Sequence, residues 1–223
     1  MSVQTPGIFA DRPGSGDNFR EVKVMTKKAV DVVLLPDEAV TQRAIEANAQ
    51  LVEKFGDQIV LHKQKCLPHI SLAMGCIDEA DIGRIETVLR QIAADFPLGK
   101  LHTAGVAISG NAKGQAVSVL VVAKDRKLQT FHEQVMNRLT DYLDNEVTDE
   151  MIYPSGPIAE STLMWIENYR AKSAFEKFLP HITLGYGRLG DFSFPAEFTA
   201  DKLAICHLGN HCTCRQILTA IEF

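Results

Sequence analysis

Apolar and polar positions alternate along the chain with two different periods, and each period predicts one type of element. Helical spacing of apolar residues, together with capping signals, predicts helices over 38–55, 79–95, 126–143 and 171–178. Shorter apolar runs, many bounded by glycine or proline, predict strands over 30–35, 59–61, 67–75, 101–109, 116–123, 179–187, 198–208 and 215–223. Because strands and helices are interspersed, the pattern predicts an α+β fold.

One strand pattern of nine residues occurs twice. The two copies are 67–75, Leu-Pro-His-Ile-Ser-Leu-Ala-Met-Gly, and 179–187, Leu-Pro-His-Ile-Thr-Leu-Gly-Tyr-Gly. Seven of the nine positions match in kind. Alternate side chains of a strand share a face, which places His69 with Ser71 and His181 with Thr183. Core packing alone does not require a histidine beside a hydroxyl on two apolar strands.

The two copies belong to a rough repeat of strand, helix, motif strand, further elements and a last strand. We assign residues 1–29 to an N-terminal arm, 30–115 to the first repeat and 116–223 to the second. From the leading strand to the histidine takes 39 residues in the first repeat (30 to 69) and 65 in the second (116 to 181). The excess falls mainly on the irregular segment 144–170, which we therefore interpret as an insertion.

Two His-x-Ser/Thr tetrads, one in each repeat, resemble the two-histidine (2H) phosphoesterase superfamily, the LigT-like RNA 2′,5′-ligase and cyclic phosphodiesterase group. The matching tetrads are His-Ile-Ser-Leu at 69–72 and His-Ile-Thr-Leu at 181–184. The resemblance covers the chain from about residue 30 to its end. It implies a single bilobal domain of two pseudo-symmetric lobes, each an antiparallel-type sheet with helices outside, and an active-site cleft between them. The first tetrad has serine where the family more often has threonine, which keeps the hydroxyl and loses a methyl group.

The resemblance implies a phosphodiesterase without metal or cofactor that hydrolyses a 2′,3′-cyclic or other small ribose cyclic phosphodiester. Histidine can act as acid or base near neutral pH, so His69 and His181 are the predicted catalytic pair, with their two roles left open. The hydroxyls of Ser71 and Thr183 are predicted to bind the phosphate. The alternatives are a 2′,5′-oligonucleotide phosphodiesterase or RNA 2′,5′-ligase, and a non-catalytic RNA- or nucleotide-binding module of the same fold.

Five further residues are weaker candidates for contacts with the substrate. The rings of Tyr153, Trp165 and Tyr169 could stack on a base, although aromatic residues of such a segment more often form a local core. Arg170 and Arg188 could meet a phosphate group.

A cysteine- and histidine-rich segment near the C-terminus is a candidate metal site. Its members are Cys206, His207, His211, Cys212 and Cys214. Their spacing matches no common zinc finger or ribbon, and residues 206 and 207 face opposite sides of a strand. We therefore expect a terminal hairpin with buried thiols and no metal ligands.

Composition and charge limit the kinds of compartment, membrane contact and substrate that we expect for this protein. The chain is 46% hydrophobic and 23% charged, as in an ordinary soluble globular protein. An odd number of cysteines, five, favours a reducing cytoplasm, and the polar N-terminus lacks the apolar core of a secretion signal. No apolar stretch approaches the length of a membrane span. The net charge of −5 disfavours an extended nucleic-acid footprint, so we expect a small nucleotide or an RNA end as substrate.

Overall fold

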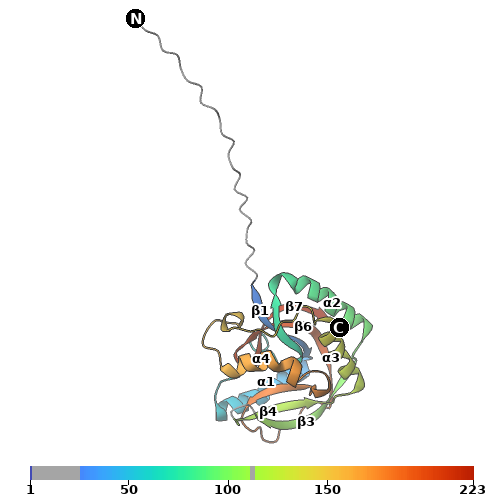
Figure 1. Cartoon of the computed structure of the whole chain (residues 1–223). Helices are drawn as coiled ribbons and strands as arrows, with labels where there is room; N and C mark the ends of the chain where they lie inside the picture. The colour runs from blue at the N-terminus through green and yellow to red at the C-terminus, as the bar shows by residue number, and fades with distance from the viewer. Residues whose placement is uncertain (2–25, 111–113) are drawn as a thin grey trace.

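The computed structural model of the chain describes residues 1, 26–110 and 114–223. Over these residues the protein has a seven-strand antiparallel sheet and four α-helices (Figure 1), which confirms the prediction of an α+β fold. Most of the predicted N-terminal arm lies outside the described residues. None of the described helices is both long enough and apolar enough to cross a membrane.

The strands and helices follow the predicted order closely. The strands are β1 (Lys27–Pro36), β2 (Ile70–Asp78), β3 (Lys100–Gly110), β4 (Ala116–Val122), β5 (His181–Tyr186), β6 (Glu197–Gly209) and β7 (Thr213–Glu222). The helices are α1 (Glu38–Phe55), α2 (Ile82–Asp95), α3 (Arg126–Arg138) and α4 (Glu160–Lys172). Short 3₁₀ turns lie at Glu79–Asp81 (η1), Asp149–Met151 (η2), Phe175–Lys177 (η3) and Asn210–Cys212 (η4).

The sheet brings the two motif strands together. Its order is β1-β2-β5-β4-β3-β6-β7, and β6 pairs with β1 as well, so the pairings run in a circuit through six strands. Residues 197–199 of β6 pair with β3, and residues 200–207 pair with β1. The motif strands β2 and β5 are antiparallel neighbours joined at Ile70 and Ile182. The pseudo-symmetric lobes and the cleft between them remain predictions.

Each motif strand is covered by a helix from the other repeat. Helix α1 of the first repeat packs on β5, whereas α4 of the second repeat packs on β2. Helix α3 also packs on β2, and α2 packs on β7 and α3. The crossed packing buries the apolar faces of both motif strands under one continuous core.

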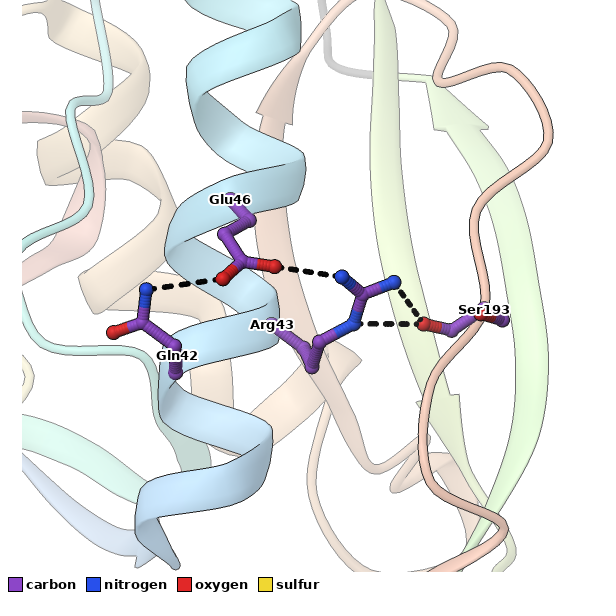
Figure 2. A network of polar contacts seen from close by, with 4 residues as sticks. All are labelled: Gln42, Arg43, Glu46 and Ser193. Carbon is purple, nitrogen blue, oxygen red and sulfur yellow. Dashed lines mark hydrogen bonds and ion pairs between the residues drawn. The ribbon is translucent and has the colours of Figure 1, made fainter.

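Helix α1 begins and is anchored by specific polar contacts. The side chain of Asp37 accepts a hydrogen bond from the amide of Val40 at 3.0 Å, as an N-cap should. Figure 2 shows Arg43 of α1 between Glu46 and the segment that follows β5. The Arg43 guanidinium donates two hydrogen bonds, of 3.1 and 2.7 Å, to the carbonyl oxygen of Ser193, and lies 4.0 Å above the ring of Phe192. These contacts tie the chain beyond the second motif to α1.

The segment 144–170 is more regular than its punctuation predicts, and the helix predicted over 171–178 is wrong. Helix α4 starts at Glu160 and ends at Lys172, and only a 3₁₀ turn follows before β5. The apolar pattern misleads here because Thr162 is buried, bonded to Asn210 Oδ1 at 2.8 Å, while Trp165 is 51% exposed. The polar residue of this helix faces inward and a large aromatic residue faces outward.

The strand predicted over 59–61 is also wrong, and α3 ends at Arg138, before the predicted 143. Ile59 and Leu61 are buried, which explains the apolar signal. Their backbone groups are bonded to a side chain: Asn48 of α1 donates to the carbonyl of Ile59 at 2.9 Å and accepts from the amide of Leu61 at 2.8 Å. One buried amide therefore replaces a neighbouring strand.

Candidate active site

The two motif strands carry the same backbone irregularity at the same place. In β2, Ser71 lies opposite Val33 and Ala73 opposite Val32, which leaves Leu72 as an extra residue. In β5, Thr183 lies opposite Val119 and Gly185 opposite Ser118, so the extra residue is the third after the histidine in both strands. The sequence repeat is therefore also a repeat of strand register and β-bulge.

Each bulge carbonyl is satisfied by a buried polar side chain from a helix. His132 of α3 donates from Nδ1 to the carbonyl oxygen of Leu72 at 2.8 Å, and its Nε2 accepts from the amide of Phe175 at 2.8 Å. Asn48 of α1 donates to the carbonyl oxygen of Leu184 at 2.7 Å. Since unpaired buried carbonyls are costly, these two side chains hold the bulges beside the candidate site. Sequence reasoning assigned neither of them a role.

The backbone also fixes both motif histidines in one tautomer. Nδ1 of His69 lies 2.7 Å from the carbonyl oxygen of Leu67, and Nδ1 of His181 lies 2.8 Å from that of Leu179. Because a carbonyl oxygen only accepts, Nδ1 carries the hydrogen in both rings. Each neutral ring therefore has an unprotonated Nε2 that can accept a proton.

The pairing of β2 and β5 arranges the four predicted groups on one face. Antiparallel pairing at Ile70 and Ile182 puts His69 across from Thr183 and Ser71 across from His181. Each histidine thus has a hydroxyl beside it on its own strand and another across from it. All four residues are partly exposed. The register thus places two histidines and two hydroxyls at the corners of one rectangle.

The ring of His69 is largely removed from solvent, which disfavours its charged form. Burial lowers the pKa of His69 to about 4, the hydrogen bond to Leu67 opposes this change, and the nearby charge of His181 lowers the pKa further. His69 is therefore neutral at physiological pH. A neutral ring with an open Nε2 is the form of a general base.

A buried carboxyl group that sequence reasoning missed lies next to the first motif histidine and its serine. Asp31, in the middle of β1, is fully buried. Its Oδ2 lies 2.6 Å from the hydroxyl oxygen of Ser71 and 3.8 Å from Nε2 of His69. The only signal in the sequence was a single charge inside an apolar strand. Burial raises the pKa of Asp31 well above its usual value, and the hydrogen bond from Ser71 partly opposes this.

One group of metal-ligating side chains forms among the described residues, and it differs from the predicted cluster. A carboxylate oxygen of Asp31, a nitrogen of His69 and the sulfur of Cys214 lie within 4.8 Å of one another. Metal binding needs a thiolate and a carboxylate, whereas burial raises the pKa of both Cys214 and Asp31. We therefore do not assign this group as a metal centre, and metal independence stays a prediction.

The rest of the C-terminal cysteine and histidine cluster serves the hairpin. Cys206 and Cys214 are buried as predicted. Nε2 of His207 donates to the carbonyl oxygen of Met151 at 2.9 Å, and Nδ1 of His211 lies 3.2 Å from the hydroxyl of Tyr186. The two histidines contact different partners and do not converge on a common point with the thiols.

The weaker substrate-binding candidates are scattered. Tyr169 is only 4% exposed and belongs to the core, so its ring is not available for stacking on a base. Tyr153 and Trp165 are about half exposed. Arg170 lies 5.2 Å above the ring of Phe175, and Arg188 is exposed two residues beyond β5.

Two surface pockets lie elsewhere, and neither includes a motif histidine. One is lined by acidic residues, Cys76 and Lys27. The other contains Lys65, Arg215 and Tyr153 and reaches Leu67, two residues before His69. Neither pocket is the cleft implied by the resemblance. No protein-family model matches the chain, and no curated protein matches it in sequence. The assignment of a function therefore depends on the geometry of the two motifs.

Proposed function

We propose that the protein is a metal-independent phosphodiesterase of the 2H type that hydrolyses a 2′,3′-cyclic or other small ribose cyclic phosphodiester. The observation that carries this proposal is the matched pair of half-sites. Each has a histidine whose Nδ1 is held by the carbonyl oxygen two residues earlier, so that Nε2 carries no hydrogen when the ring is neutral. Each histidine also has a hydroxyl opposite it on the neighbouring strand.

The two histidines divide the proton transfers of the reaction. His69, which burial keeps neutral, takes a proton from the attacking water through Nε2. His181, in its doubly protonated form, donates the Nε2 proton to the ribose oxygen that leaves as the bond from phosphorus to that oxygen breaks, and both rings regain their starting protonation by exchange with solvent. Each such transfer is worth roughly 10²–10⁴ in rate. The hydroxyls of Ser71 and Thr183 donate to the non-bridging oxygens, where negative charge grows in the transition state.

The proposal is tested by turnover on a panel of small substrates. Purified protein, treated with a chelator and dialysed, is offered 2′,3′-cyclic and 3′,5′-cyclic nucleoside monophosphates and a 2′,5′-linked dinucleotide. We expect ring opening of a 2′,3′-cyclic nucleotide that survives chelation. The His181→Ala variant should abolish it, whereas His62→Ala, at an exposed histidine outside the motifs, should not change it. Lack of turnover on every substrate, or activity restored only by added metal, would refute the proposal.

A 2′,5′-oligonucleotide phosphodiesterase or ligase is the second candidate, and one observation favours it. The pocket that contains Lys65, Arg215 and Tyr153 reaches Leu67, close to the first histidine. Lys63 also lines this pocket, so three cationic side chains and a partly exposed ring are available there, which suits a strand of several phosphates and bases. Such a substrate would give a log–log salt slope of roughly −0.7 for each phosphate contacted. A shallow slope, together with unchanged kinetics of Lys65→Glu and Arg215→Glu, supports the small substrate instead.

A further inference from the structure

Asp31 is a buried acid without the partners that a buried charge needs. It has no solvent exposure, and among the described residues its carboxyl group is hydrogen-bonded to Ser71 alone. Its second oxygen, Oδ1, is buried and has no hydrogen-bond partner. Among the described residues, the nearest group able to carry a positive charge is His69, at 3.8 Å.

The titratable groups that face Asp31 come from each element packed around it. They are His69 beside β2, Tyr169 of α4, Cys212 of η4, Cys214 of β7, and Cys206 of β6, which is the register partner of Asp31. Burial, and then the charge of Asp31, raises the pKa of both Tyr169 and Cys212. None of these neighbours is a permanent cation. An ionised Asp31 would be a buried full charge stabilised by a single hydrogen bond. A neutral Asp31 leaves only one carbonyl oxygen without a partner, which costs much less free energy.

The protonation of Asp31 decides what Ser71 can do. A serine hydroxyl has one hydrogen to donate and two lone pairs. An ionised Asp31 accepts that hydrogen, and Ser71 then turns only lone pairs toward a phosphate. A protonated Asp31 donates to Ser71 Oγ, and the serine hydrogen becomes available to the phosphate.

We infer that Asp31 acts as a neutral carboxylic acid that donates to Ser71 Oγ and thereby directs the Ser71 hydroxyl hydrogen toward a phosphate oxygen. Asp31 is thus a positioning residue, and the inference rests on the proposed function. The register of the second half-site supports it. Met74 and Tyr186 are each the fifth residue after the motif histidine. Met74 pairs with Asp31 of β1, whereas Tyr186 pairs with Val117 of β4, so the second half-site has a valine at the position of Asp31. The methyl group of Thr183 restricts the rotation of its side chain. Ser71 lacks that methyl group, and the hydrogen bond with Asp31 restricts its hydroxyl instead.

The kinetic test compares two replacements of Asp31. Asp31→Val copies the second half-site, and we expect kcat to fall roughly tenfold or more with a much smaller change in KM, since Ser71 acts mainly in the transition state. Asp31→Asn has an amide that donates to Ser71 Oγ and cannot ionise, so it should recover most of the loss. When Ser71 is already replaced by Ala, the additional Asp31→Val replacement should lower kcat little further, because Asp31 acts through Ser71. Val117→Ala, the matched control, should leave kcat unchanged.

The pH profile adds a readout that a merely structural role would not move. Beyond any decline from loss of the general acid, which both proteins share, wild-type kcat should decline further as pH rises through the raised pKa of Asp31, where the acid ionises and takes the serine hydrogen. Asp31→Asn should lack that further decline. If Asp31→Asn is as slow as Asp31→Val, the working form is the carboxylate and the inference is wrong. Zinc-dependent activity that disappears in Asp31→Asn would overturn it as well, because a metal would need the ionised acid.

A stability measurement separates this inference from the proposed function. A raised folded-state pKa gives a stabilisation that is complete below the unfolded pKa and is lost as pH rises toward the folded value. Across that window the unfolding equilibrium constant of wild type should rise about tenfold per pH unit relative to Asp31→Asn. Parallel curves would overturn the inference. If wild type cleaves no substrate, the proposed function fails, yet this comparison still decides the protonation of Asp31.

Discussion

The strand that carries His69 and the strand that carries His181 share one backbone pattern and differ in what surrounds them. Both have the same bulge and the same bond from histidine to a carbonyl two residues earlier. In the first strand that carbonyl belongs to Leu67, which is 8% exposed, and in the second to Leu179, which is 74% exposed. The backbone repeat places the two histidines and two hydroxyls in matching positions, whereas the burial around the two histidines differs.

The crossed packing of the helices explains how two unequal surroundings arise on a repeated backbone. Helix α4 packs on β2 and carries Tyr169 next to Asp31, while α1 packs on β5 and carries Asn48. Each half therefore depends on a helix of the other half for its cover. We infer that neither repeat would bury its motif strand alone.

The largest expected effect is the loss of kcat when either motif histidine is replaced. His69→Ala and His181→Ala should each lower kcat by at least about a hundredfold, because general acid–base help is worth ~10²–10⁴. The double variant should be only slightly slower than the worse single variant, since the two act in one reaction. Steady-state kinetics of the three proteins measure this. A difference of more than about a hundredfold between the single variants would show that the two histidines are not a pair.

The next effect concerns the side chains that hold the two bulges. Asn48→Ala and His132→Ala each leave at least two buried backbone groups unpaired. Each should cost about 3 kcal/mol of unfolding free energy, measured by denaturant unfolding. The control is Gln42→Ala, which removes an exposed helix-surface bond to Glu46 and should change stability by less than about 0.5 kcal/mol. Equal stability of all three variants would mean that water replaces the buried bonds.

The third prediction uses the unequal burial of the histidines. With the pKa of His69 near 4, the base stays unprotonated through the mildly acidic range. The acid limb of kcat/KM should therefore fall near pH 4 to 5, about two units below that of an exposed histidine. An acid limb at about pH 6.5 would exclude His69 as the base.

The same burial makes folding sensitive to acid. Burial lowers the folded-state pKa of His69 and of His132 to about 4. Their stabilisation is therefore complete above the unfolded value of about 6.5 and is lost as pH falls toward 4, on the order of 3 kcal/mol for each ring. His132→Ala should lose about half of this dependence.

Much of the arrangement of the candidate site could be predicted from sequence because it is local. The period of a strand alone puts His69 and Ser71 on one face, and the repeat does the same for His181 and Thr183. The pairing of β2 with β5 was implied only by the resemblance. Nothing local showed that these strands would be neighbours.

The partners of the motifs could not be predicted, because each comes from a distant element. Asp31 appeared only as a charge in an apolar strand, and its contact with Ser71 spans 40 residues. Asn48 and His132 lie on helices whose apolar pattern says nothing of which carbonyl they reach. Helix α4 was missed for a related reason: Thr162 is inside and Trp165 is outside, so the sequence lacked a helical apolar face.

The smallest expected effect compares the two leucines that orient the histidines. Leu67 packs against Val33 and Cys214 in a small buried cluster, so Leu67→Ala should cost about 2–3 kcal/mol. Leu179 is mostly exposed, and Leu179→Ala should change stability by less than about 0.5 kcal/mol. Both variants keep the carbonyl that holds Nδ1, so kcat should stay within a few fold in each. A KM raised severalfold only in Leu179→Ala would indicate that this side chain meets the substrate. A loss of kcat in Leu179→Ala beyond about tenfold would contradict the view that the backbone alone orients His181.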